Sequence, residues 1–202
     1  MQVTDHILQT AFSMFMKYGV RSVSMDDLAQ DMGMSKKTIY GVFPSKESLI
    51  SEVILRHLQA DEKEILAIRD NSSDAIEEIW LISQHVLKFL SKIKPSLIFD
   101  LKKFYPQCWA LIEKQHFDFI KETIEMNIIR GQKEGLYRHD INADIVAKLY
   151  VGKSNIIVNP DIFPPENYDL YELIREMGKH HLHGIISSSG QSRLAAIPFY
   201  SS

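Results

Sequence analysis

The prolines of this 202-residue chain fall between segments of helical periodicity, and this pattern restricts the fold more than any other feature. From Ile7 to Tyr18, for example, apolar residues recur at steps of three and four, and Gly19 ends the run. No segment alternates apolar and polar residues for long enough to predict a strand. The sequence therefore predicts an all-α protein. Helices are expected over residues 4–18, 25–32, 36–43, 46–69, 73–92, 95–104, 106–133, 142–156 and 166–187.

Several of these helices begin at residues that can cap a helix. Ser24, Ser35, Ser45 and Ser73 each offer a side-chain oxygen to free backbone N–H groups. The short helices near the amino terminus cannot stand alone, so we expect them to pack on the helix over 4–18 as a unit of about 45 residues.

Composition restricts the remaining possibilities. The chain is 45% hydrophobic and 24% charged, which is ordinary for a protein with a buried core. No stretch approaches the roughly 18 apolar residues of a membrane span, and the first residues lack a secretory signal, so we expect a cytoplasmic protein without a membrane partner. The single cysteine, Cys108, cannot form an intramolecular disulfide or a thiolate metal cage. With a net charge of -3, binding to nucleic acid must depend on a local patch.

Residues 25–44, MDDLAQDMGMSKKTIYGVFP, contain the motif on which the functional prediction depends. Two short helices joined by a tight turn at Gly33 would pack at a steep angle, as in a helix-turn-helix. Ala29 lies where the first helix must let the second approach closely. The residues expected to face inward are Leu28, Met32, Met34, Ile39 and Val42.

The second motif helix leaves a polar and partly basic face exposed, which suits phosphates and base edges in a major groove. The first sixty residues hold six Lys or Arg and six Asp or Glu, so only the clustering of lysines near this helix favours DNA. The alternative is the solvated face of a helical protein that never contacts DNA. The exposed set is Ser35, Lys36, Lys37, Thr38 and Tyr40.

Residues 5–56 resemble the tetracycline-repressor (TetR) family of bacterial transcriptional regulators. The resemblance rests on FMKYGVRSVSM, which closes the first helix, followed by DDLAQDMGMSKKTIYGVFPSKESLI. Residues 128–150 are also similar to the family, with a helix ended by Gly135 and a new helix capped by Asn142. Gly41 departs from the pattern, because relatives usually carry a larger residue there.

The resemblance implies roles in DNA binding for the matching positions. Lys36 and Lys37 are the expected base readers, and Arg21 is expected to reach the DNA backbone or a minor groove. For Tyr40, the alternative to a phosphate contact is a ring packed half in the core. The full predicted set is Arg21, Ser24, Ser35, Lys36, Lys37, Thr38, Tyr40 and Lys46.

The resemblance also implies the domain organisation and the partners. Residues 1–45 would form the helix-turn-helix DNA-binding domain, 46–190 a ligand-binding and dimerisation domain, and 191–202 a C-terminal tail. The implied protein is a homodimer that binds a double-stranded operator and is released by a small-molecule effector, most simply a repressor. The apolar residues expected at a four-helix dimer interface are Leu149, Tyr150, Ile156, Leu170, Leu173, Ile174, Met177, Leu182, Ile185 and Ile186.

Aromatic residues of the larger carboxy-terminal part are candidates for an effector pocket. Because few ionisable residues lie among them, we expect a neutral or weakly polar effector. The two histidines in this set could orient a ligand, although such residues are more often hydrogen-bonded core residues. The candidate ligand residues are Trp80, His85, Phe89, Phe99, Phe104, Tyr105, Trp109 and His116.

The sequence contains no pattern that predicts catalysis or a cofactor. It has no Gly-rich phosphate loop, nucleophile elbow or HExxH motif. His180, His181 and His183 lie close together, but we interpret them as interfacial or solvent-exposed residues, so no metal site is predicted. The alternative to a regulator is a helical ligand-binding module or an enzyme that does not act on DNA.

Overall fold

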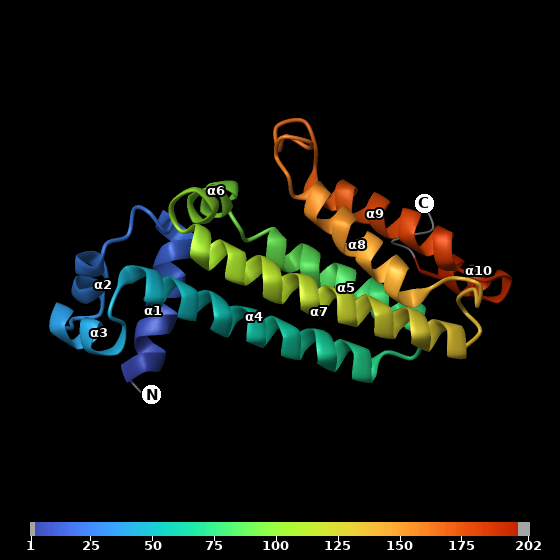
Figure 1. The fold of residues 1–202 in the computed structure, drawn as a ribbon, viewed down its shortest axis with the longest axis horizontal. Coiled ribbons are helices and arrows are strands. Elements are labelled where there is room, and N and C mark those ends of the chain that lie inside the picture. Colours follow the sequence, from blue (N-terminus) through green and yellow to red (C-terminus); the bar gives the residue numbers. More distant parts are fainter. Residues whose placement is uncertain (1–2, 198–202) are drawn as a thin grey trace. The chain divides into compact units, whose positions relative to one another are not determined.

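The structure, a computed structural model, describes residues 3–197 and is built from helices (Figure 1). Over these residues the only extended pairing is an isolated bridge between Tyr137 and Ile186, so the all-α prediction is confirmed. None of the helices described is long and apolar enough to cross a membrane. The helices are α1 (Val3–Tyr18), α2 (Met25–Asp31), α3 (Lys36–Val42), α4 (Lys46–Asn71), α5 (Ala75–Leu90), α6 (Pro95–Phe104), α7 (Pro106–Lys133), α8 (Ala143–Ile157), α9 (Leu170–Ile185) and α10 (Ser188–Ala195).

The last part of the chain differs most from the sequence prediction. The expected helix over 166–187 begins only at Leu170, because the Asp169 side chain caps it by accepting the N–H of Glu172 at 3.1 Å. The helix α10 was not predicted, and the boundary expected after residue 190 lies inside it. Residues 198–202 of the predicted tail lie outside the described residues.

Most of the predicted caps are present. Ser24, Ser35 and Asn142 precede α2, α3 and α8, and each side chain accepts a backbone N–H of the following helix. The start of α5 is different. There Asp74, rather than Ser73, accepts backbone N–H groups, at 2.8 and 3.0 Å.

The first of two compact units contains the described residues up to Lys63 together with Leu90–His116. Its core is formed by apolar residues of α1 to α4, with Leu101 of α6 and Cys108 of α7. Cys108 is buried, with its sulfur 3.1 Å from the hydroxyl of Ser51. The motif helices are therefore fixed on a continuous apolar core. Six of its side chains are completely buried: Ile7, Ala11, Leu28, Ile39, Leu49 and Ile50.

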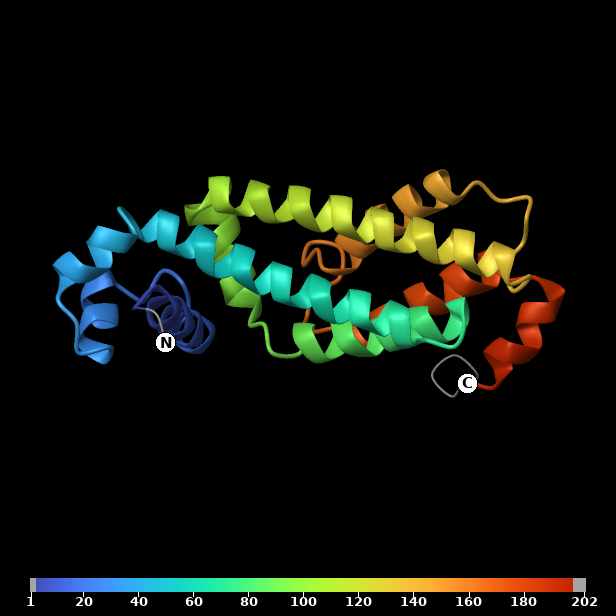
Figure 2. The same ribbon diagram turned by 90° about the horizontal axis from the view of Figure 1, so that it is seen from below.

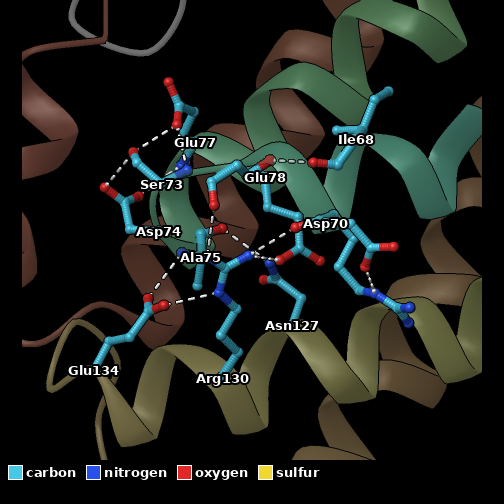
Figure 3. Close-up of polar contacts among 12 residues, drawn as sticks. Ile68, Asp70, Ser73, Asp74, Ala75, Glu77, Glu78, Asn127, Arg130 and Glu134 are labelled. Carbon is cyan, nitrogen blue, oxygen red and sulfur yellow. Dashed lines mark hydrogen bonds and ion pairs between the residues drawn. The ribbon is translucent and has the colours of Figure 1, made fainter.

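The second unit contains Glu64–Phe89 and the described residues from Phe117 onward. A polar network inside it ties the start of α5 to α7 (Figure 3). Arg130 donates to the Oε2 of Glu78 at 2.8 Å, to Glu134 at 2.7 Å and to the carbonyl of Ser72 at 2.8 Å. Glu78 is completely buried, and this burial raises the pKa of its carboxyl group. Arg130 is thus the cation that compensates a buried acid.

Candidate nucleic-acid interface

The helices α2 and α3 form the predicted helix-turn-helix at one end of the first unit (Figures 1 and 2). Gly33 has a φ of +61°, a left-handed conformation that favours glycine. One residue later, the N–H of Met34 donates to the carbonyl of Ala29 at 2.9 Å. The turn therefore closes as the sequence indicates.

The buried side of the motif fixes which residues of α3 are exposed. Leu28 and Ile39 are completely buried, and Met32 and Met34 pack against the same core. The prediction that Val42 faces inward was wrong, because its side chain is 38% exposed. Val42 is the last residue of α3, and the following residue, Phe43, fills the core instead.

The opposite side of α3 is open to solvent. Lys36, Lys37, Thr38 and Tyr40 are all exposed. Tyr40 is 45% exposed, so its ring is partly open to solvent and partly packed, and its phosphate contact stays a prediction. At Gly41, a Cβ atom would meet no atom within 4 Å apart from its chain neighbours and the backbone of its own helix. The face is therefore accessible along the whole of α3.

The two lysines at the start of α3 differ in their electrostatic surroundings. The ammonium group of Lys36 forms an ion pair with Asp26 of α2, and both side chains remain about half exposed or more. Lys37 has no ion pair to any residue in the part of the chain that the structure describes. Lys37 is thus the uncompensated cation of this face.

The hydroxyl groups in the predicted DNA-binding set also serve as caps. Ser24 and Asp27 form a capping box, in which the Ser24 Oγ accepts from the Asp27 N–H at 3.1 Å and donates to its carboxylate at 2.7 Å. These bonds from Ser24 lower the pKa of Asp27. Ser35 accepts the N–H of Thr38 at 3.1 Å, and their hydroxyl groups lie 2.9 Å apart.

Arg21 and Lys46 lie beside α6 rather than on α3. The Lys46 ammonium donates to the Arg21 carbonyl at 3.4 Å and lies 5.7 Å from the centre of the Tyr105 ring. Partial burial lowers the pKa of Lys46. The Arg21 guanidinium lies 4.4 Å from the centre of the Phe104 ring.

Two further cations, both on α6, have no role in the sequence prediction. Lys102 lies 4.8 Å from the ring centre of Trp109, and Lys103 lies 5.2 and 5.5 Å from those of Phe99 and Phe104. The signal in the sequence is the run KKFYPQCW, where two lysines adjoin aromatic residues. Only the aromatic residues of this run enter the sequence prediction.

The structure does not place the eight candidate ligand residues together in one unit. Trp80, His85 and Phe89 belong to the second unit, and the other five belong to the first. Among those five, Phe99 is 57% exposed and Phe104 is 38% exposed. His116 is also exposed. A pocket lined by this set stays a prediction.

Two open grooves on the first unit contain none of the candidate ligand residues. A groove of about 450 Å³ lies along α1 and reaches Asp31 of α2. A second groove, of about 400 Å³, lies between α1 and α4, where Phe12 stacks on His57 with ring centres 4.4 Å apart.

The three histidines of α9 lie in different environments. His181 is buried, whereas His180 and His183 are exposed. The Nδ1 of His180 lies 3.0 Å from the ammonium group of Lys153 on α8. In the described part of the chain, no three His, Cys, Asp or Glu side chains are grouped to hold a metal ion.

The apolar residues predicted for the dimer interface differ in their exposure to solvent. Leu149 and Ile156 of α8 are exposed by 60% and 47%, and Leu173 and Met177 of α9 are half-buried. Four others belong to the interior of the protomer and cannot form an interface. These are Ile174, Leu182, Ile185 and Ile186, each no more than 6% exposed.

Comparisons with known proteins agree with this geometry. Residues 7–53 match the family model described as bacterial regulatory proteins, tetR family. The chain is 27% identical over 159 residues to the HTH-type transcriptional regulator YvaF of Bacillus subtilis (strain 168), covering 77% of this chain and 80% of YvaF. It is 24% identical to the HTH-type transcriptional repressor KstR2 of Mycolicibacterium smegmatis, covering 70% and 71% of the two chains. A transcriptional regulator from Saccharomonospora viridis, solved in complex with choline, has the same fold, with a TM-score of 0.73, 21% identity and coverage of 91% and 97%.

Proposed function

Because the chain belongs to the tetR family of bacterial regulatory proteins and is a transcriptional regulator, we propose that it is a homodimeric repressor that a small molecule releases from its operator. The observation that carries this proposal is the exposed face of α3, held on a helix-turn-helix whose other side is buried. An exposed, basic helix on a rigid support suits the major groove of DNA.

We assign the contacts on DNA from the environment of each side chain. Lys37 is the principal base reader, since no carboxylate compensates it, and Tyr40 and Thr38 contact phosphates from the same exposed face. Lys36 must keep or exchange its Asp26 partner when DNA binds. Ser24 and Ser35 fix the first turns of α2 and α3 through their caps. We propose that their exposed sides approach the DNA backbone.

The proposed dimer forms through α8 and α9, which pack together in the protomer. Ile145, Leu149 and Ile156 follow one another at helical spacing on α8 and are 47–60% exposed. Tyr171 of α9 is 46% exposed. Exposed apolar stripes on two neighbouring helices are typical of a surface that another protein covers. In a two-fold dimer, the two α3 helices would enter successive major grooves, about 34–36 Å apart, of a palindromic operator.

The proposed effector is a neutral or weakly polar small molecule. The sequence supports this class through the aromatic residues Trp80 and Phe89 of α5, whereas the rings of α6 and the start of α7 lie beside cations. The structural relative from Saccharomonospora viridis was solved with choline, which supports a small-molecule effector without identifying it. An effector that favours one arrangement of the two α3 helices would shift the proposed dimer between its DNA-binding and released populations.

This proposal places the protein in the cytoplasm, with its operator, and gives it no catalytic step. The experiment that tests the function is selection of bound fragments from a genomic library, followed by electrophoretic mobility shift across salt concentrations. We expect a palindromic operator whose affinity falls steeply with salt. If no fragment is retained and no salt-dependent binding occurs, the chain does not act on DNA. A screen for compounds that both stabilise the protein and release it from this operator then tests the effector.

A further inference from the structure

We propose that Arg21, Lys102 and Lys103 form a second DNA contact, which binds the phosphate backbone outside the segment read by α3. We call these three residues the α6 basic patch. The inference rests on the proposed function, because it assigns a further part of the surface to the same DNA.

The patch is continuous with the helix-turn-helix. Arg21 lies in the connection between α1 and α2, three residues before the cap residue Ser24. Its guanidinium lies over the Phe104 ring at 4.4 Å, and the Lys103 ammonium lies 5.5 Å from the centre of the same ring. The carboxyl end of α6 therefore lies against the segment that leads into α2, as Figure 1 also shows.

A second contact fixes the other end of α6 on the same unit. Lys94, which precedes α6, donates from its ammonium group to the carbonyl of Lys17 at 2.8 Å. Leu101 of α6 is buried in the core that also holds α2 and α3. The patch and the motif are thus fixed on one core.

The charge distribution supports a contact with DNA. The first sixty residues carry equal numbers of cations and anions, whereas residues 90–116 carry five lysines and only two acids, Asp100 and Glu113. Residues 61–63, which complete the first unit, add two acids and one lysine, so the positive excess of the unit comes from the segment that contains α6. The charge of Asp100 opposes the effect of burial on the pKa of Lys46, so this acid lies within electrostatic range of Lys46.

Aromatic rings rather than carboxylates hold the cations of the patch. Lys102 lies over Trp109, and Arg21 and Lys103 share Phe104. Across residues 3–197, no ion pair joins any of the three to a carboxylate, in contrast to Lys36 with Asp26. A cation over an aromatic face is positioned but keeps its charge. It can therefore still neutralise a phosphate.

The arrangement suits a duplex backbone because the three cations are exposed and belong to the same unit as α3 without being part of that helix. Phosphate contacts of this kind fix the register of a protein on DNA without reading sequence. Each neutralised phosphate adds to the salt dependence of binding, with a slope of about 0.9 per phosphate. The patch therefore predicts that base pairs flanking the operator increase affinity regardless of their sequence.

The test uses the full-length protein and two duplexes. One duplex contains only the selected operator, and the other extends it by about one helical turn, roughly 10 base pairs, on each side. We expect the wild-type protein to bind the longer duplex more tightly and with a steeper salt slope. The double variant Lys102→Gln/Lys103→Gln should bind the two duplexes with equal affinity. On the longer duplex, its salt slope should be lower than that of the wild type by about 0.9 for each phosphate that is no longer neutralised.

Matched variants separate a DNA contact from a general loss of charge. Lys114→Gln removes one exposed lysine from α7 in the same unit and should leave the flank effect intact. Phe104→Leu keeps apolar bulk but removes the ring beneath Arg21 and Lys103, so we expect the flank effect to decrease in part. Thermal unfolding of each variant shows that the fold is retained.

Two results would overturn the inference in different ways. If the wild-type protein binds both duplexes equally, and the double variant has the wild-type salt slope, the patch does not contact DNA although the proposed function stands. If the wild-type protein binds no duplex in a salt-dependent way, the proposed function fails and the inference fails with it.

Discussion

Lys36, at the start of α3, is ion-paired with Asp26 of α2, so one of the two predicted base readers has an acidic partner within the protein. Asp26 is exposed, and its ion pair with Lys36 places its side chain beside the face of α3 that we propose contacts DNA. This pair links the helix that supports the motif to the helix that reads DNA. It also reduces the net charge of the reading face.

Replacing Asp26 with Asn should increase affinity for DNA of any sequence. The change removes a negative charge near the phosphates and releases Lys36, and we expect a gain of about 0.2–1 kcal/mol, the range of exposed charge pairs. Titration of operator and unrelated duplexes measures it. Asp118→Asn, an exposed acid of α7, is the control with the same change in charge. A gain confined to the operator would mean that Asp26 itself takes part in base reading.

Lys37→Ala should weaken operator binding without affecting the fold. Lys37 is exposed and has no carboxylate partner in the described part of the chain, so its loss should cost about 1–3 kcal/mol and relax specificity at one base pair. Lys46→Ala should instead lower the salt slope by about one, and should also lower thermal stability because its stem is partly buried beside Tyr105. Unchanged specificity in Lys37→Ala would move base reading to another residue.

A charge on the exposed stripe of α8 should dissociate the dimer. Leu149→Glu places a carboxylate where the proposed partner packs, and an unpaired buried charge is strongly unfavourable. Leu173→Glu tests the same interface from α9. Sedimentation velocity should show monomers for both, and a dimer for Leu111→Glu, which alters an exposed leucine of α7. Dimers in all three variants would place the interface elsewhere.

Removing Arg130 should destabilise the second unit. Arg130→Met leaves the completely buried Glu78 without its cation, and we expect a loss of about 3–5 kcal/mol in urea unfolding. Arg138→Met breaks an exposed pair with Asp140 and should change stability by no more than about 0.5 kcal/mol. Glu78→Gln combined with Arg130→Met should recover part of the loss. Equal effects of the two single arginine variants would contradict the role of the network.

His181 should make stability depend on pH in the acidic range. Burial, with smaller effects from Lys153 and His180, lowers the pKa of His181 to about 3 in the folded protein, against about 6.5 when unfolded. Between these values the unfolded chain binds more protons, so the free energy of unfolding falls as the pH decreases from about 6.5 toward 3.

The variant His181→Phe isolates this contribution. A comparison is needed because the protein also loses stability in acid when carboxylates with lowered pKa values, such as Asp27 and Asp74, are protonated. As the pH decreases, the free energy of unfolding of the wild type should fall more steeply than that of the variant, by up to about 1.4 kcal/mol per pH unit. His183→Phe, at an exposed position, should follow the wild type. Parallel curves for the wild type and His181→Phe would show that His181 does not titrate in this window.

The sequence predicted nine of the helices because periodicity and capping are local properties. The helix that it did not predict, α10, lacks an apolar stripe and depends on tertiary packing. Its Gly190 lies so close to the segment that follows α7 that a Cβ atom would be 2.3 Å from the carbonyl oxygen of Leu136. Leu194 is then buried in the core of the second unit. No local pattern could indicate such a fit.

The reading face was predictable for the same reason, since burying Ile39 determines which residues of α3 point outward. The charge partners were not predictable. Asp26 pairs with Lys36, and Arg21 meets Phe104, only because the chain folds back on itself. An aromatic residue in the sequence can line a pocket or lie exposed beneath a cation, and its residue type does not show which of the two occurs. The sequence therefore predicts Phe104 only as a pocket residue.

Gly41 gives the reading helix an unused position. Glycine in a helix is about 1 kcal/mol less favourable than alanine, and here no neighbouring atom lies within 4 Å of the missing Cβ. An alanine at this position would thus strengthen α3, and any side chain there would be added to the exposed face that we propose reads DNA. Under that proposal, a descendant of this regulator would change its operator at Gly41 without first weakening its fold.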